Sequence, residues 1–104
     1  TKVQAAGQIG LDPSTGELVP GGITNQTRQA MTNIEAIMTA AGATMAEIVE
    51  CTVLMQDLGD YDQLNAVYAT YFDADNAPAR AAFEVVKLPK GALTESKCSA
   101  AIEP

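Results

Sequence analysis

The sequence contains no histidine and no tryptophan among its 104 residues. Without histidine, a Ser-His-Asp or Cys-His catalytic arrangement and a histidine-based metal site are excluded. The chain also has neither of the two glycine-rich loops, Gly-x-Gly-x-x-Gly and Gly-x-x-x-x-Gly-Lys-Ser/Thr, that cradle nucleotide phosphates. The chemistry of any site must therefore come from carboxylates, amides, hydroxyls or a few basic side chains.

Positive charge is also scarce. Six basic residues stand against thirteen acidic ones, and the formal net charge is −7 at pH 7. Such a field repels phosphate backbones, and no cluster of lysine and arginine counters it, so we expect no nucleic-acid partner. No apolar stretch approaches the roughly 20 residues of a membrane helix, and no signal-like segment opens the chain. We therefore expect a soluble, cytoplasmic protein with no membrane partner.

The chain has only two cysteines, Cys51 and Cys98, in segments that we expect to be strands. They lack the spacing of metal and redox motifs. The favoured interpretation is that both are small apolar core residues, with a disulfide as the alternative. Aromatic residues make up 5% of the chain, so the core must be aliphatic.

The 104 residues are enough for a single domain, 1–104. Hydrophobic periodicity and turn residues predict six elements. They are a strand over 2–9, a helix from an N-cap at Thr24 to Gly42, a strand over 47–58, a helix from Asp60 to about Phe72, and strands over 80–88 and 92–102. The last two strands are joined at Pro89–Gly91 and are expected to form a β-hairpin.

This order of elements predicts an α+β fold with two helices packed on one face of a mixed β-sheet. The other face of the sheet would stay open. An open aliphatic face on a small acidic protein favours a partner subunit, and self-association is the usual form.

The carboxylates show no metal-binding spacing. Asp57, Asp60 and Asp62 come closest, but they surround a predicted helix start, where the helix dipole favours acidic residues. We therefore expect helix capping there rather than a cation site, and no metal.

Arg80 and Glu95 are the candidate site residues. Arginine offers a planar fork that binds a carboxylate, and a glutamate can orient a water and relay its proton. A hairpin about Pro89–Gly91 would let the two side chains approach near its open end. The alternative is an ion pair of Arg80 with Asp73 or Asp75, and a solvated Glu95 at a sheet edge. Residue types and spacing alone favour that alternative, and the choice stays open at this point.

Four blocks of sequence share the order and spacing of one protein family. They are GQIGLDPSTGELVPGGI at 7–23, NAVYATYF at 65–72, PARAAFEV at 78–85 and LPKGALTE at 88–95. Together they resemble the RidA/YjgF family of reactive-intermediate deaminases. The resemblance implies a YjgF-like (chorismate-mutase-like) fold in a homotrimer, with the sheets packed into a central barrel and active clefts at the subunit interfaces.

The resemblance also implies an activity. It is the hydrolysis of a 2-imino acid or enamine, such as 2-iminobutanoate or 2-iminopropanoate, to the 2-keto acid and ammonia, with no cofactor. Arg80 of the PAR block would bind the substrate carboxylate, and Glu95 would orient the attacking water. Asn65 would line the cleft, Gly7 would bring its backbone to the ligand, and Ala82 stands where many members carry a cysteine.

Departures from the family pattern define the alternative functions. Ala6 stands where the family usually has a serine, which removes one hydroxyl from the site. Family members also begin further upstream, so we expect this chain to lack their first strand. The alternative function is a non-catalytic trimer that binds carboxylate ligands or acts as a chaperone. Ribonuclease activity, which is ascribed to relatives, is disfavoured by the net charge of −7.

Overall fold

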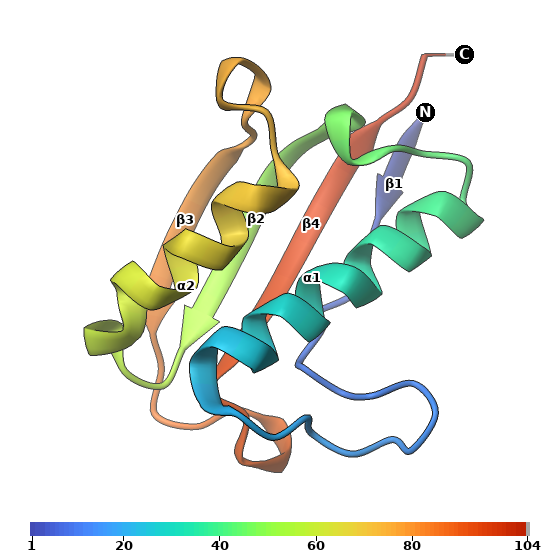
Figure 1. Cartoon of the computed structure of the whole chain (residues 1–104). Helices are drawn as coiled ribbons and strands as arrows, with labels where there is room; N and C mark the ends of the chain where they lie inside the picture. Colours follow the sequence, from blue (N-terminus) through green and yellow to red (C-terminus); the bar gives the residue numbers. More distant parts are fainter. Residues whose placement is uncertain (104) are drawn as a thin grey trace.

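The computed structural model of the chain describes residues 1–103. Its regular elements are β1 (Lys2–Gln4), α1 (Gly22–Ala40), β2 (Ile48–Met55), α2 (Tyr61–Tyr68), β3 (Ala79–Glu84) and β4 (Thr94–Ala101). Short 3₁₀ turns lie between several of them, and Figure 1 shows the two helices lying on the same side of the sheet. Every predicted helix and strand is present, although each strand is shorter than its predicted range.

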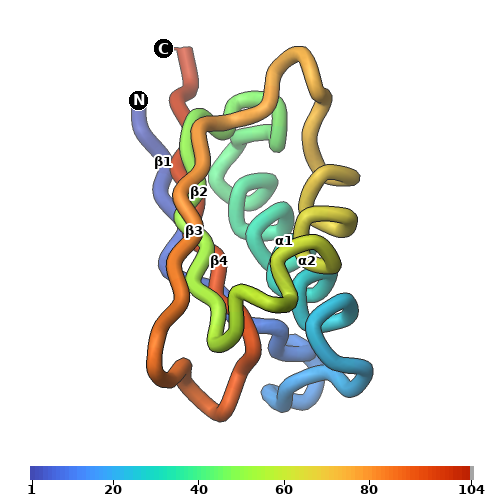
Figure 2. Tube along the Cα trace, turned by 90° about the vertical axis from the view of Figure 1, so that its left-hand side faces the viewer, coloured from blue at the N-terminus to red at the C-terminus, as the bar shows by residue number. Residues whose placement is uncertain are grey.

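The four strands form one mixed sheet in the order β1-β4-β2-β3. β2 pairs antiparallel with β4 and parallel with β3, and β1 pairs antiparallel with β4. Seen from the side, the sheet forms one layer and the two helices form the other (Figure 2). The prediction of an α+β fold with two helices on one face of a mixed sheet is therefore confirmed.

The predicted hairpin of the last two strands is wrong. β2 lies between β3 and β4, so the turn at Pro89–Gly91 joins two strands that do not pair. The reason is the position of α2: a helix between β2 and β3 carries the chain back along the sheet, and β3 then pairs with β2 in parallel. The other edge of β2 is left for β4.

The main core lies between the sheet and the helices and is aliphatic, as predicted. Its fully buried aliphatic side chains include Met31, Ile34 and Met38 of α1, Val53 and Met55 of β2, and Leu64 of α2. Side chains alternate along a strand, so the positions between those of β2 point to the face of the sheet that carries no helix. We call that side the helix-free face.

Cys51 and Cys98 form a disulfide, so the prediction of two free core thiols is wrong. They occupy directly opposite positions on β2 and β4, with 4.1 Å between their Cα atoms. Both are buried, as predicted. The sequence pattern places each cysteine on a strand, but the register that brings the sulfurs together joins segments 47 residues apart.

Helix α1 begins three residues earlier than predicted. Its N-cap is Gly21, with φ 108°, so Thr24 lies within the first turn. Gly42 follows the C-cap Ala41 in the left-handed region, with φ 84°, as predicted for the end of this helix. Asp60 is at the N-cap position of α2, as predicted, but its side chain makes no capping hydrogen bond. Within residues 1–103, neither helix is both long and apolar enough to span a bilayer.

Candidate functional site

Strand β3 presents Arg80 to helix α2. Arg80 lies directly opposite Cys51, whose side chain is buried under the helices, so both side chains point to the same face of the sheet. On α2, Tyr61, Asn65 and Tyr68 follow a spacing of four and three residues, which aligns them on one side of the helix. That side of α2 meets Arg80.

The guanidinium of Arg80 is held by two neutral hydrogen-bond acceptors. Nη1 donates to the Asn65 side-chain oxygen, and Nη2 donates to the Tyr61 hydroxyl oxygen over 2.6 Å. Cζ also lies 5.2 Å from the centre of the Tyr61 ring and 4.8 Å from that of Tyr68, within the range of cation–π attraction. A guanidinium has five N–H donors, so about three stay available to a ligand. Neither acceptor neutralises its charge.

The acidic loop before β3 does not supply the partner of Arg80. The Asp73 carboxylate accepts a hydrogen bond from the Asp75 backbone amide over 3.1 Å, while the hydrogen bonds of Arg80 go to α2. For Arg80, the alternative of an ion pair with this loop is therefore wrong within residues 1–103.

Tyr68 supports Arg80 through its ring alone. The side chain is buried, and its hydroxyl has no hydrogen-bond partner within residues 1–103. Burial raises the pKa of Tyr68, and the neighbouring charge of Arg80 offsets part of this effect. The raised pKa means that Tyr68 stays neutral beside the guanidinium to a higher pH than an exposed tyrosine would.

Arg80 lines one cavity, and a second cavity lies beside its contact Tyr61. The first has a volume of about 330 Å³, and its lining includes Arg80, Asn65, Tyr68, Phe72 and Pro78. The second has a volume of about 430 Å³ and is lined by Leu58, Tyr61 and Ala82. Ala82 lies two positions after Arg80 and therefore on the same face of β3. A ligand bound to Arg80 thus has apolar space beside it.

Glu95 lies on the other face of the sheet. It is directly opposite Leu54 of β2, three positions after Cys51, and an odd spacing along a strand puts two side chains on opposite faces. Its neighbours Thr94 and Ser96 are buried under the helices. Glu95 itself is half-buried on the helix-free face.

Gly7 packs directly against Glu95. The pairing of the N-terminal segment with β4 passes from Gln4–Ser99 to Gln8–Ser96, so this segment contains one residue more than β4 between the two pairs. Such an extra residue is a β-bulge. A Cβ atom at Gly7 would lie 2.6 Å from Oε2 of Glu95, closer than carbon and oxygen can approach without a shift. Because Gly7 has no side chain, the Glu95 carboxylate can occupy this position.

The five predicted site residues thus fall into two groups. We call Arg80, Asn65 and Ala82 the arginine half-site, and Gly7 and Glu95 the glutamate half-site. Arg80 and Glu95 are two strands and three residues apart. At about 4.8 Å per strand and about 3.3 Å per residue, their Cα atoms are about 14 Å apart. Because they also lie on opposite faces, one chain does not bring both half-sites to one ligand.

Tyr61 and Tyr68 are contacts of Arg80 that the sequence reasoning missed. The helical pattern places Tyr68 in the apolar stripe of α2 and assigns no role to Tyr61. The available signal is their spacing around Asn65, because residues three and four positions away are its neighbours on the helix surface.

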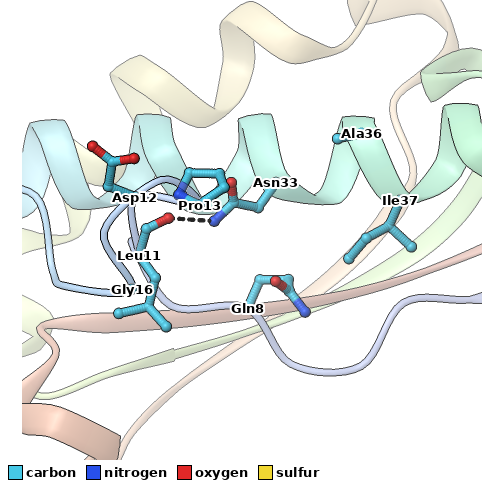
Figure 3. A pocket seen from close by; sticks show the side chains of 8 residues that line it. All are labelled: Gln8, Leu11, Asp12, Pro13, Gly16, Asn33, Ala36 and Ile37. Carbon is cyan, nitrogen blue, oxygen red and sulfur yellow. Dashed lines mark hydrogen bonds between the residues drawn. The ribbon is translucent and has the colours of Figure 1, made fainter.

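A third cavity, of about 340 Å³, lies between the 11–16 loop and α1 (Figure 3). There the Asn33 amide donates to the Leu11 carbonyl over 2.9 Å. Asp12 accepts hydrogen bonds from the hydroxyl and amide of Ser14, which lower its pKa. The lining carries no basic side chain and so does not suit a carboxylate ligand. Nor do residues 1–103 contain a group of three acidic or cysteine side chains placed to hold a metal ion.

Residues 1–102 match a protein family described as Endoribonuclease L-PSP. Among curated proteins, the chain is similar to the 2-iminobutanoate/2-iminopropanoate deaminase of Rattus norvegicus. The two are 44% identical over 102 residues, which cover 98% of this chain and 74% of the relative.

Solved structures agree over nearly the whole chain. The structure of a putative endoribonuclease from Thermotoga maritima is similar with a TM-score of 0.94 at 35% identity, covering 99% of this chain and 80% of that one. The structure of E. coli TdcF with bound serine is similar with a TM-score of 0.91 at 34% identity, covering 98% and 81%. Sequence and fold therefore point to the same group of proteins.

Proposed function

The chain belongs to the Endoribonuclease L-PSP family, also called YjgF/RidA, and we propose that it hydrolyses 2-imino acids to 2-keto acids and ammonia. The observation that carries this proposal is the Arg80 guanidinium, fixed by two neutral acceptors with its charge and several N–H groups available. A 2-imino acid offers a carboxylate directly beside the reactive imine carbon. The name of the rat relative, 2-iminobutanoate/2-iminopropanoate deaminase, supports this substrate class.

The complete site forms between copies of the chain in a homotrimer. Phe83 lies opposite Leu54 on the helix-free face and is 55% exposed, which is apolar surface that another sheet would cover. Three such sheets around a central axis form a barrel. This assembly brings the arginine half-site of one chain to the glutamate half-site of the next, which accounts for their position on opposite faces.

The chemistry requires only water. Arg80 holds the substrate carboxylate and thereby fixes the imine carbon, while Glu95 and the Gly7 backbone hold the attacking water. Glu95 accepts a proton as the water oxygen bonds to carbon and passes it to the imine nitrogen, and transfer of the remaining hydroxyl proton to the same nitrogen makes ammonia the leaving group. The C–N bond then breaks and the water oxygen becomes the keto oxygen. The balance consumes one water and needs no cofactor or redox partner.

The substrate side chain is small and aliphatic. The cavity between Leu58, Tyr61 and Ala82 lies beside Arg80 on the same face of β3 and carries no charge. Side chains of the size of those in 2-iminopropanoate and 2-iminobutanoate suit such a space.

A non-catalytic carboxylate-binding trimer is the second candidate. It is favoured by Ala6 and Ala82, which bring neither a hydroxyl nor a thiol to the site. The arginine half-site could still retain a carboxylate ligand in such a protein. Turnover distinguishes the two candidates.

The test is hydrolysis of a 2-imino acid produced in situ by an amino-acid oxidase, with semicarbazide trapping the imine that escapes. Wild type is compared with Arg80→Ala and Glu95→Gln. We expect wild type to lower semicarbazone formation and each variant to lose at least about 100-fold in rate. The matched control is Arg28→Ala, which removes the only other arginine, an exposed residue of α1.

The outcomes separate the two candidates. Loss in both site variants with an unaffected Arg28→Ala supports the deaminase. A wild type that leaves the semicarbazone yield unchanged, but retains 2-oxobutanoate through Arg80, contradicts turnover and supports the binding protein.

A further inference from the structure

We propose that Tyr61 is a positioning residue for the substrate carboxylate: its hydroxyl fixes one arm of the Arg80 guanidinium in the orientation that receives the ligand. This inference rests on the proposed function and adds a residue outside the predicted site. Its basis is the 2.6 Å hydrogen bond from Arg80 Nη2 to the Tyr61 hydroxyl. The Tyr61 ring lies under the same guanidinium, 5.2 Å from Cζ.

Two contacts on different nitrogens restrict the guanidinium more than one contact does. Asn65 accepts from Nη1 and Tyr61 from Nη2, so rotation of the planar group breaks at least one bond. Arginine has a long, flexible side chain, and a fork that is already oriented loses less freedom when it binds a carboxylate. Without the Tyr61 hydroxyl, only Asn65 and the two rings hold the fork.

A hydroxyl is suited to this role because it accepts a hydrogen bond without carrying a charge. A carboxylate at the same place would orient Arg80 but would also neutralise it, and would repel an anionic ligand. Tyr61 is 38% exposed and borders the cavity that contains Ala82. It therefore stands at the solvent-exposed side of the arginine half-site.

The strand that carries Arg80 also helps to place Tyr61. Glu84, at the end of β3, accepts a hydrogen bond from the Leu58 amide over 2.9 Å. The Asp57 carboxylate accepts from the Gly59 amide over 2.8 Å and caps the turn before α2, in line with its predicted capping role. These bonds fix the chain just before Tyr61 relative to β3. The Tyr61 hydroxyl and the Arg80 guanidinium therefore keep a fixed position relative to each other.

Tyr71 provides a matched control outside the arginine half-site. Its hydroxyl donates to the Arg28 carbonyl over 3.1 Å and lies 3.0 Å from the Thr32 hydroxyl, so it contacts α1 rather than Arg80. Tyr61→Phe and Tyr71→Phe therefore each remove one hydrogen-bonded hydroxyl and keep the ring. Only the first change removes a bond to the guanidinium.

The experiment measures kcat and KM for imine hydrolysis, and the Kd of 2-oxobutanoate by calorimetry. We expect Tyr61→Phe to raise KM and Kd about tenfold, as befits a lost hydrogen bond to a charged group, while kcat changes less than about twofold. Tyr71→Phe is expected to match wild type in all three. Thermal unfolding of both variants checks that each is folded as wild type.

Three results would overturn the inference: a Tyr61→Phe variant that matches wild type, a loss in kcat without a change in Kd, or an equal loss in Tyr71→Phe. Failure of the proposed function looks different. In that case wild type hydrolyses no imine, yet Tyr61→Phe still weakens 2-oxobutanoate binding and the positioning role stands. A wild type that binds no 2-keto acid contradicts both proposals.

Discussion

The two half-sites are built in different ways. Arg80 is enclosed by a helix and a strand that are close in sequence, 61–68 and 79–84, and two hydrogen bonds and two aromatic rings orient it. Glu95 instead lies on the helix-free face beside the bulge at Gly7, where strands from opposite ends of the chain meet. The first half-site is organised by local contacts, and the second by long-range pairing.

This difference indicates what one chain can prepare alone. A guanidinium in a ring of neutral acceptors is ready to bind an anion before any partner arrives. The surroundings of a carboxylate on an uncovered sheet face, by contrast, depend on the partner that packs against that face. Under the proposed function, binding depends mainly on the fold of one chain, whereas turnover depends on how chains meet.

The strongest test of this division between binding and turnover is to mix two inactive variants. If each site combines the arginine half-site of one chain with the glutamate half-site of another, Arg80→Ala and Glu95→Gln chains complement each other. Random co-assembly in equal amounts leaves about a quarter of the sites intact. We expect semicarbazide-trap activity to rise from the background of either variant to about a quarter of wild type after joint refolding.

Asn65→Ala provides the control for this experiment. Asn65 and Arg80 belong to the same half-site of one chain, so an Arg80→Ala chain mixed with an Asn65→Ala chain can form no intact site. That mixture should show no gain. Co-assembly of Arg80→Ala with Glu95→Gln, demonstrated by mass spectrometry but without recovery of activity, would show that the site does not form between chains.

Removal of the disulfide is expected to lower stability without separating the half-sites. Cys51 lies on β2, the strand between those of Arg80 and Glu95, and Cys98 lies on β4, the strand of Glu95; their disulfide closes a loop with a sequence separation of 47. Loop-closure entropy predicts that the Cys51→Ala/Cys98→Ala variant loses about 4 kcal/mol in free energy of unfolding. Urea unfolding at fixed protein concentration measures this loss.

Activity per folded molecule should stay within about twofold of wild type, because hydrogen bonds and strand register position both half-sites independently of the sulfurs. Reductant should shift wild type toward the double variant and leave that variant unchanged. Equal unfolding midpoints for oxidised wild type and the double variant would contradict a stabilising disulfide.

The parts of the fold that sequence could predict are those with local causes. The spacing of Met31, Ile34 and Met38 predicts the buried side of α1, and Gly42 marks its end. Strand pairing has no such local signal. The order β4-β2-β3 and the Cys51–Cys98 bond both depend on register between distant segments, which explains why the hairpin and the free thiols were wrong predictions.

The same distinction between local causes and long-range register applies to the candidate site. The types of Arg80 and Glu95 suggested a carboxylate site, but which face each side chain points to depends on register, so their direct approach could not be judged from sequence. Tyr61 was missed for another reason. Its role comes from one hydroxyl aimed at a strand residue 19 positions later, and a helical pattern alone does not reveal that contact.

The smallest expected effect is that of Gly7→Ala, which acts on the glutamate half-site alone. The new Cβ would lie 2.6 Å from Oε2 of Glu95. The flexible carboxylate can move aside, so the free energy of unfolding should change by less than about 1 kcal/mol. The displaced carboxylate no longer holds the water, and we expect kcat to fall about tenfold with an unchanged Kd for 2-oxobutanoate.

Gly42→Ala should lower stability without changing kcat. It therefore separates the effect of backbone strain from the effect of a displaced Glu95 carboxylate. Gly42 has φ 84° with open space around its Cα, at the end of α1, so a side chain there costs about 1 kcal/mol of stability through backbone strain alone. Its kcat should equal that of wild type. If Gly7→Ala instead lost stability and kept kcat, the bulge would serve the fold rather than the carboxylate, and Gly7 would leave the proposed site. A rise in Kd would mean that the two half-sites do not divide binding from turnover.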